Sequence, residues 1–281
     1  MKNYIFIVLF LCLCISCITI PERTISQSRQ NQVLTFNKIT PGSYLLNSCG
    51  YSVLPATDGN LIICGTTMTY SFDCEEGLIL KAYTNGDYLW ARTFSGIDNS
   101  CGQCRYIKQI KDGLVLVGTA KFNKDRGDDI ALIKIDNEGN TVWSKNFGSN
   151  GDDYGYSMEL TSDNGYIIAG STNQPSNLFY LVKTDDSGNL IWEKTFGQTG
   201  SAATAYSVKQ TKDKGFIIAG DIVVSNTPNS ADVYIVKIDE NGNSLWAKTF
   251  NINAADSANS LLQTSDGEYM VCGTSGDKKY F

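Results

Sequence analysis

A short apolar run that ends in glycine recurs five times and constrains the fold more than any other feature of the chain. The runs read NLIICG, LVLVG, YIIAG, FIIAG and YMVCG, and they end at Gly65, Gly118, Gly170, Gly220 and Gly273. Each run follows a turn sequence such as ATDG or TSDNG, in which Asp can bond the backbone ahead of it and Gly can adopt a positive φ. Repetition with a period of roughly 50 residues predicts an array of equivalent supersecondary units.

Three further β-strands are predicted in each full repeat. LILKAY, IALIKID, FYLVKTD and VYIVKID follow the first four runs, and their apolar start on both faces is typical of a strand between two neighbours. A glycine turn then leads to a third strand that carries Trp90, Trp143, Trp192 or Trp246. A fourth strand leads into the next Asp-Gly turn.

Four short strands joined by hairpins are typical of one propeller blade. We therefore expect an all-β fold, a β-propeller of about five four-stranded blades, with a β-sandwich as the competing fold. The four tryptophans should occupy equivalent, largely buried positions, one on each blade.

The two ends of the repeat region leave the number of blades open. Val33–Ile39 (VLTFNKI) matches the tryptophan strand without its Trp, and GYSV at 50–53 matches GYSM at 155–158. The sequence stops where the second strand of the fifth repeat should begin. Either the N-terminal segment closes the ring with one edge missing, or the sequence is a fragment of a larger propeller, because propellers need protected edges.

The first 17 residues have the composition of an export signal. Lys2 precedes an apolar segment at 4–15, and Ser16-Cys17 ends it. We expect a lipoprotein-type signal at 1–17 with Cys17 lipidated, and plain secretion and an uncleaved anchor remain alternatives. Residues 18–32 are expected to form a polar tether and residues 33–281 the repeat domain. The chain is then exported, to the cell envelope or outside the cell, and contacts a membrane only through its lipid.

The charge composition excludes several classes of function. The chain has 29 acidic and 23 basic residues, a net charge of −6 and no histidine. A nucleic-acid partner normally requires a basic face, so none is expected. Without histidine there is no Ser-His-Asp triad and no His-ligated metal site. We expect a monomer with no cofactor, no metal and no catalytic residue.

The pattern Asp-Gly, Ile-Ile-Ala-Gly, Lys-x-Asp-x-x-Gly-Asn-x-x-Trp resembles the propeller repeats of bacterial surface and secreted proteins, many of them predicted lipoproteins in Bacteroidetes-like genomes. Its D-x-x-G-x-x-x-W element occurs at Asp136–Trp143, Asp185–Trp192 and Asp239–Trp246, with Tyr83 at the Asp position of the first repeat. This element is similar to the tryptophan-docking element of quinoprotein-like propellers, in which each Trp packs between adjacent blades. The resemblance implies location and scaffold, and no activity.

Four other motifs favour structural roles. Cys101-Gly-Gln-Cys104 resembles a redox motif, but it lies in an all-β chain without the helix N-terminus that such a motif needs. Asp152-Asp153 lacks the ligand spacing of a calcium loop and is interpreted as solvated. Arg126-Gly127-Asp128 is interpreted as the start of a strand. The fixed position of the tryptophans indicates packing and not a carbohydrate platform, and Cys64 and Cys272 are interpreted as small buried thiols.

The alternating strand direction places both glycine turns of a repeat at one end of the sheet, the bottom, and the two other connections at the top. Cys49, Cys74, Cys101 and Cys104 are assigned to top connections of the first two repeats, so we expect two disulfides among them, with the pairing open. The varied top loops are expected to bind an unidentified protein or glycan. The leading hypothesis is a non-enzymatic scaffold of the cell envelope or a secreted one. A propeller-type enzyme, glycan-acting or quinone-dependent, and a purely structural envelope subunit are the alternatives.

Overall fold

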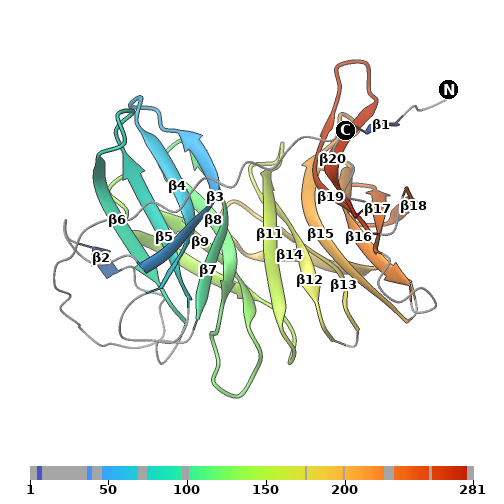
Figure 1. The fold of residues 1–281 in the computed structure, drawn as a ribbon, viewed down its shortest axis with the longest axis horizontal. Coiled ribbons are helices and arrows are strands. Elements are labelled where there is room, and N and C mark those ends of the chain that lie inside the picture. The colour runs from blue at the N-terminus through green and yellow to red at the C-terminus, as the bar shows by residue number, and fades with distance from the viewer. Residues whose placement is uncertain are drawn as a thin grey trace. The chain divides into compact units, whose positions relative to one another are not determined.

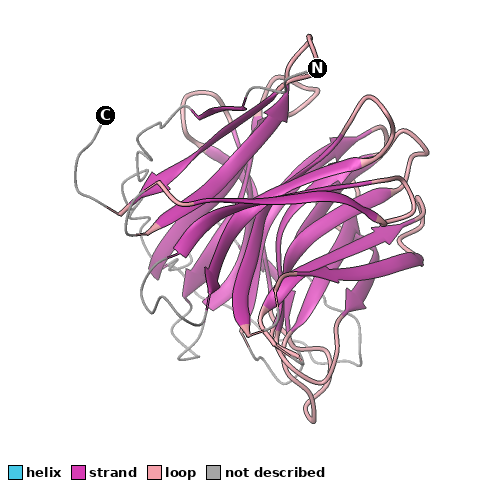
Figure 2. Cartoon of the chain, turned by 90° about the vertical axis from the view of Figure 1, so that its right-hand side faces the viewer, coloured by secondary structure: helices cyan, strands magenta, loops and turns pink. Residues whose placement is uncertain are grey.

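The computed structural model describes residues 5–7, 37–39, 46–68, 75–96, 101–174, 176–198, 200–224, 231–252 and 255–276. Over these residues all regular structure is β-strand, as Figure 2 shows, so the all-β prediction is confirmed. None of the described segments forms a helix long and apolar enough to cross a bilayer. The chain divides into two compact units, Cys14–Gly155 and Met1–Leu13 with Tyr156–Phe281.

The unit Cys14–Gly155 contains two antiparallel sheets. The first has the order β2-β6-β5-β4-β3, and the second has the order β10-β9-β8-β7 (Figure 1). The strands are β2 (Asn37–Ile39), β3 (Leu46–Pro55), β4 (Leu61–Met68), β5 (Glu75–Ala82), β6 (Tyr88–Phe94), β7 (Gly102–Ile110), β8 (Gly113–Ala120), β9 (Asp129–Ile135) and β10 (Thr141–Phe147). Asn37–Ile39, predicted to help close a ring, instead extends the first sheet beyond β6.

The other unit contains three sheets, with the orders β11-β12-β13-β14, β15-β16-β17-β18 and β1-β20-β19. Their strands are β11 (Asp153–Leu160, which begins in the preceding unit), β12 (Tyr166–Thr172), β13 (Leu178–Thr184), β14 (Leu190–Phe196), β15 (Ser201–Gln210), β16 (Phe216–Val224), β17 (Ala231–Ile238), β18 (Ser244–Phe250), β19 (Asp256–Gln263) and β20 (Tyr269–Ser275). Ile5–Ile7, within the predicted export signal, forms β1 and pairs parallel with β20.

Each sheet is offset from the predicted repeat by one strand. The predicted fourth strand begins the next sheet, and we call it the leading strand (β3, β7, β11, β15 and β19). The tryptophan strand (β6, β10, β14 and β18) is the last strand that each repeat adds to its sheet. The two strands between them hold the core, since β8 is buried along its whole length and β13 along nearly all of it.

The recurring glycine is explained by a bulge in the leading strand. The bulge places one extra residue in the leading strand at Tyr51, Arg105, Tyr206 and Asn259. It also brings a carbonyl against the glycine opposite: a Cβ added at Gly220 would lie 1.8 Å from the Thr204 oxygen. The same clash would occur at Gly65, Gly118 and Gly273, so these positions cannot hold a side chain without local movement.

The glycine turns form as predicted, with one difference. Gly59 and Gly267 have φ of +82° and +93°, as the Asp-Gly turns require. In TSDNG and TKDKG the positive φ instead belongs to Asn164 (65°) and Lys214 (64°). The glycine that follows each of these is needed for space, because a Cβ at Gly165 would lie 2.1 Å from the Thr184 oxygen.

Candidate functional site

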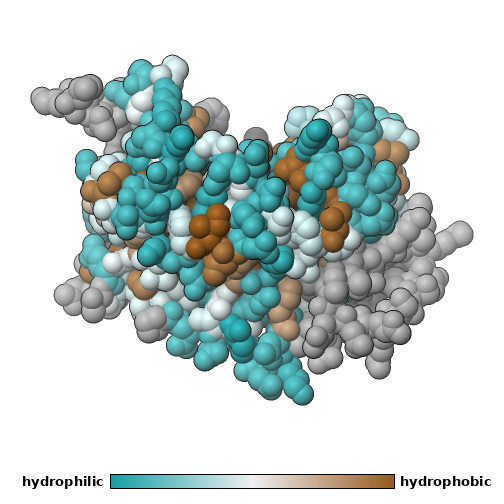
Figure 3. Space-filling model, turned by 180° about the vertical axis from the view of Figure 1, so that it is seen from behind, coloured by the Kyte–Doolittle hydropathy of each residue, from teal (hydrophilic) through white to brown (hydrophobic). Residues whose placement is uncertain are grey.

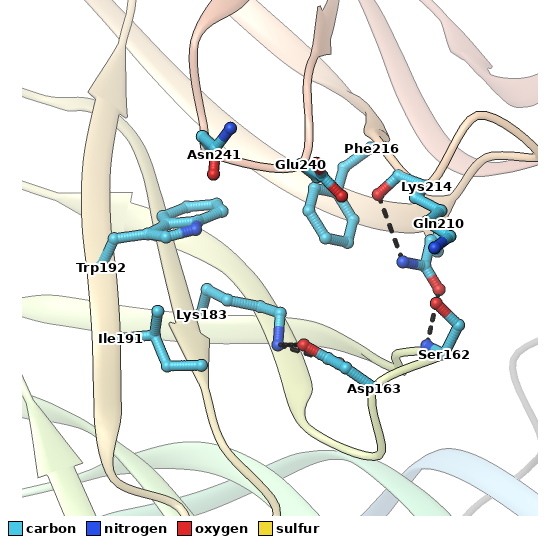
Figure 4. Close-up of a pocket in the computed structure, with 10 residues that line it drawn as sticks. All are labelled: Ser162, Asp163, Lys183, Ile191, Trp192, Gln210, Lys214, Phe216, Glu240 and Asn241. Atoms are coloured by element: carbon cyan, nitrogen blue, oxygen red, sulfur yellow. Dashed lines mark hydrogen bonds and ion pairs between the residues drawn. The ribbon is translucent and has the colours of Figure 1, made fainter.

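A pocket of about 310 Å³ lies where the β11–β14 sheet meets the β15–β18 sheet (Figure 4). Trp192 and Ile191 of β14 form one side and Phe216 of β16 lies opposite. Three turns contribute polar side chains, together with Lys183 of β13 and Gln210 of β15. The lining residues are Ser162, Asp163, Lys183, Ile191, Trp192, Gln210, Lys214, Phe216, Glu240 and Asn241. The pocket therefore lies at the glycine-turn end of the sheets, away from the loops expected to bind a partner.

The charged pair in this pocket is part of the repeat. Lys183 Nζ donates to both oxygens of Asp163, at 3.1 and 2.9 Å, and to the Thr184 carbonyl at 2.9 Å. All three ammonium protons are thus used. The same Lys–Asp pair joins the strand before the tryptophan strand to the Asp-Gly turn in three other sheets, as Lys81–Asp58, Lys134–Asp112 and Lys237–Asp213. We conclude that Lys183 anchors a turn.

Gln210 has a similarly structural role. Its Oε1 accepts a hydrogen bond from Ser162 N at 2.8 Å, and its Nε2 donates to the Lys214 carbonyl at 3.2 Å (Figure 4). Gln263 repeats both contacts in the last sheet, with Lys212 N and the Gly267 carbonyl. The polar lining of the pocket is therefore repeated along the chain and already bonded, which indicates a structural seam between sheets.

Trp90, Trp192 and Trp246 pack between adjacent sheets, as the sequence predicts. Trp192 meets Phe216 of the next sheet edge-on at 6.1 Å, and Trp246 meets Tyr269 at 6.1 Å. All four tryptophans occupy the same place on the tryptophan strand. Each is largely buried, as predicted, but none is fully buried. The tryptophan strand lies outside the buried middle strands, and in β14 and β18 most residues are exposed.

The leading strand differs from this uniform seam. Its bulge position holds Tyr51, Arg105, Tyr206 and Asn259, and Tyr156 is at the matching sequence position of β11, so the position is Tyr in three sheets, Arg in one and Asn in one. All five side chains keep contact with solvent. The serine after the bulge, in contrast, serves the fold: Ser157 Oγ accepts from Val208 N at 3.4 Å and Ser207 Oγ accepts from Leu261 N at 3.2 Å, each across a seam. The bulge position is therefore the best candidate for a functional surface.

In the unit that contains Tyr156–Phe281, two bulge tyrosines meet. The rings of Tyr156 and Tyr206 lie 5.4 Å apart at an angle of 55°. Tyr206 also hydrogen-bonds to Asp221, and burial together with this carboxylate raises the pKa of Tyr206 to about 12. Burial raises the pKa of Asp221 too, although hydrogen bonds from Ser257 and Tyr206 oppose the shift. The result is a tyrosine pair whose second hydroxyl is held in place.

In the unit Cys14–Gly155, the same two strand positions form a cation–π contact. The Arg105 guanidinium lies 4.1 Å from the centre of the Tyr51 ring. Gln103 Oε1 accepts from Arg105 Nε at 3.0 Å, and Gln103 Nε2 donates to Glu75 at 3.0 Å. The repeated Tyr-Ser step of GYSV, GYSM and AYSV is the sequence signal that could have identified this surface, but its exposure depends on the bulge.

The loop that contains Arg126-Gly127-Asp128 is closed on itself. The Arg126 guanidinium donates to the Gly148 carbonyl at 2.8 Å and to the Ser149 carbonyl, so it does not project as an adhesion motif. Asp153, interpreted from the sequence as solvated, is fully buried, and its Oδ2 accepts from Ser149 N at 2.6 Å. The expected solvation is therefore wrong for Asp153, which caps the loop before β11.

The cysteines predicted to lie in top loops are placed differently. Cys49 lies within β3 and Cys104 within β7, where Cys104 is fully buried, and Cys101 directly precedes β7. The assignment of Cys49 and Cys104 to loops is therefore wrong. Cys49, Cys101 and Cys104 are free thiols in the structure, so the expected disulfides stay a prediction. Cys74 and the lipidation residue Cys17 lie outside the described residues.

The described residues contain no group of three or more Cys, Asp or Glu side chains arranged to hold a metal ion. Comparison with known proteins adds evidence on the fold alone. No family model matches the chain, and no curated protein matches it. Among solved structures, a protein of unknown function from Dyadobacter fermentans is similar at a TM-score of 0.51 and 12% identity, over 89% of this chain and 75% of that one. MPT-4, a mannose phosphorylase from Leishmania mexicana, gives a TM-score of 0.44 and 9% identity, over 94% and 86% of the two chains. At 12% identity, the likeness to the Dyadobacter protein concerns the all-β fold alone and not activity.

Proposed function

We propose that this chain is a non-enzymatic binding scaffold of propeller type, in which each sheet is one blade and the bulge positions of the leading strands contact a glycan. The observation that carries the proposal is the contrast between two positions of the repeat. The seam around Trp192 uses side chains that bond one another in sheet after sheet, whereas the bulge position holds Tyr in three sheets and stays partly exposed in all five. Accessible side chains on a rigid scaffold are where binding usually resides.

A glycan suits the chemistry of this surface. Tyr156 and Tyr206 offer an aromatic face with polar hydroxyls at its rim, and such amphipathic rings give contact area at a low entropy cost. The Tyr206 hydroxyl is fixed by Asp221, so the surface is ordered before the ligand arrives. The net charge of −6 and the nearby carboxylate disfavour a polyanion. We therefore propose a neutral oligosaccharide.

Glycan-array binding of the full chain tests this proposal. Tyr206→Ala and Tyr156→Ala should each weaken binding to neutral glycans at least tenfold, since each removes one of the two rings. Tyr83→Ala is the matched control, because Tyr83 is an exposed tyrosine in a glycine turn of the first repeat and should leave binding unchanged. An array with no neutral glycan bound, or binding that survives both tyrosine substitutions, would contradict the proposal. Binding only to an extracellular protein would point to the other partner class.

Export to the cell envelope is part of the same proposal. It rests on Lys2, the apolar segment at 4–15 and Ser16-Cys17. Cleavage before Cys17 and lipidation of its thiol should place the protein in the membrane fraction of an expressing bacterium. Cys17→Ala should release it, and partitioning that persists in this variant would contradict lipidation.

A further inference from the structure

Cys64 and Cys104 meet across the seam between the first two sheets. Both side chains are fully buried, both belong to one apolar cluster, and their thiols are in hydrogen-bonding contact. Cys64 lies on β4 and Cys104 on β7, so the contact joins two sheets that are separate in the hydrogen-bonding pattern. A free cysteine in a protein interior often acts as a small hydrophobic side chain, but two cysteines in contact can also form a disulfide.

The repeat shows that this contact is built into the fold. Cys64 directly precedes the recurring glycine, and Cys104 directly precedes the bulge residue of the next sheet. The same two positions in the next seam hold Val117 and Gly155, where a Cβ added at Gly155 would lie 3.0 Å from Val117 Cγ2. The positions are therefore in direct contact.

The later seams fill these positions with alanine. Ala169 and Ala205 lie in one buried cluster, and Ala219 and Ala258 lie in another. Alanine opposite alanine and valine opposite glycine show that the seam has room for only a few side-chain atoms here. A disulfide between Cys64 and Cys104 adds no atom to this narrow place, since its formation only removes the two thiol hydrogens.

We propose that Cys64 and Cys104 form a disulfide that links the first two sheets. The two thiols lose two protons and two electrons to a small-molecule disulfide such as oxidised glutathione. The Cys64 Sγ–Cys104 Sγ bond forms, the S–S bond of glutathione breaks, and two glutathione thiols are released. This linkage differs from the pairing among Cys49, Cys74, Cys101 and Cys104 expected from the sequence, and it is independent of the proposed glycan site.

The disulfide should form while the chain folds and not in the folded protein. Both thiols are inaccessible, and burial together with contact with Cys64 raises the pKa of the Cys104 thiol, which disfavours the reactive thiolate. Oxidised glutathione should therefore form the bond while the chain refolds and act very slowly on reduced, folded protein. Once formed, the bond should resist reductants until the protein unfolds.

Peptide mapping of the full chain tests the proposal. Protein with Cys101→Ser, so that Cys104 is the only cysteine in its tryptic peptide, is reduced, denatured and refolded with reduced and oxidised glutathione. It is then denatured, alkylated without reductant and digested, and fragment ions locate the linked cysteine within the tryptic peptide 39–81, which holds Cys49 and Cys74 as well as Cys64. A Cys64–Cys104 linked peptide is the expected product. Alkylation of both cysteines, or linkage of either one to another cysteine, would overturn the proposal. Cys272→Ser is the matched control, because Cys272 occupies the Cys64 position of the last repeat, and it should leave the linked peptide unchanged.

Thermal unfolding gives a second readout. The double variant Cys64→Ala/Cys104→Ala reproduces the alanine seam of the later sheets, so it should fold. Oxidised wild-type protein should melt roughly 5 °C or more above protein that was unfolded, reduced and refolded with reductant. The double variant should show no such difference. If the melting temperature of the double variant depended on reductant as much as that of the wild type, the proposal would also be overturned.

Discussion

Gly242 lies against the indole of Trp192, so that the turn of one sheet covers the tryptophan of the sheet before it. A Cβ added at Gly242 would lie 3.4 Å from Trp192 Cδ2 and 3.1 Å from Lys194 Cγ. Gly139 covers Trp90 in the same way, at 3.2 Å from the ring. Gly139 and Gly242 therefore each have two roles: the glycine allows the turn, and it leaves space for the tryptophan of the preceding sheet.

Gly242→Ala should separate these two roles. Gly242 has a φ of +81°, and Gly267 has a φ of +93° with no atom within 4 Å of an added Cβ. Gly267→Ala should therefore lose about 1 kcal/mol from backbone strain alone, while Gly242→Ala should lose more because the indole must move. Urea unfolding measures both changes. If the two variants are equally stable, the contact with Trp192 has no energetic weight.

Trp192→Ala should destabilise the protein by about 2 kcal/mol, less than the 3–5 kcal/mol typical of a fully buried Trp, because the ring is not fully buried. Ile191→Ala is the matched control, since Ile191 is 55% exposed and adjacent to it on the same strand, and it should change stability by less than about 0.5 kcal/mol. Equal losses in the two variants would mean that the seam does not depend on the indole.

Gly220→Ala should cost about 3 kcal/mol or more, because a Cβ there would lie 1.8 Å from the Thr204 carbonyl and neither backbone can yield without disturbing the bulge. The bulge also supports Ser207, which caps Leu261 N in the next sheet. We therefore expect a loss of cooperativity in the unfolding transition as well. A variant with wild-type stability would show that the leading strand adapts easily.

The repeat made the sheets predictable, because each strand carries its own pattern of apolar residues and each turn its own glycine. The sequence also predicts that Trp192 packs between sheets. It also predicts that Trp192 is largely buried, although the ring keeps some contact with solvent because the tryptophan strand lies outside the buried middle strands. The sequence does not show which strand begins each sheet, because every pair of consecutive strands is predicted as a hairpin.

The candidate site was harder to predict than the fold. Tyr206 stays accessible because a bulge rotates it out of the alternating pattern, and a bulge is visible only once the partner strand is known. Asp153 follows a polar stretch typical of a solvated loop, yet its carboxylate is buried and accepts a hydrogen bond from Ser149 N. Cys104 has the glycine and polar neighbours of a loop, but it lies within β7 and is fully buried.

Acid should weaken the turn that Lys183 anchors. Burial opposes ionisation of Asp163, but hydrogen bonds from Thr161 and Lys183 outweigh it and lower the pKa of Asp163 to about 2. A carboxyl with a lowered pKa in the folded state stabilises the protein fully above its unfolded pKa of about 4, and this stability is lost as the pH falls from about 4 through 2. Asp163→Asn should be less stable at pH 6 and less sensitive to acid in this window. Identical pH profiles of urea unfolding for variant and wild type would contradict this assignment.

Alkaline pH should lower the stability of the folded protein through ionisation of Tyr206. The pKa of Tyr206 is raised to about 12 by burial and by Asp221, so between pH 10 and 12 the folded state holds a proton that the unfolded state has lost. The free energy of unfolding should therefore fall as the pH rises through this window, and Tyr206→Phe should remove that part of the slope. Asp221→Asn removes the carboxylate charge, so absorbance titration at alkaline pH should show Tyr206 ionising at lower pH than in the wild type. A tyrosinate titration that is unchanged in Asp221→Asn would mean that Asp221 does not control Tyr206. The held hydroxyl on which the glycan proposal relies would then be absent.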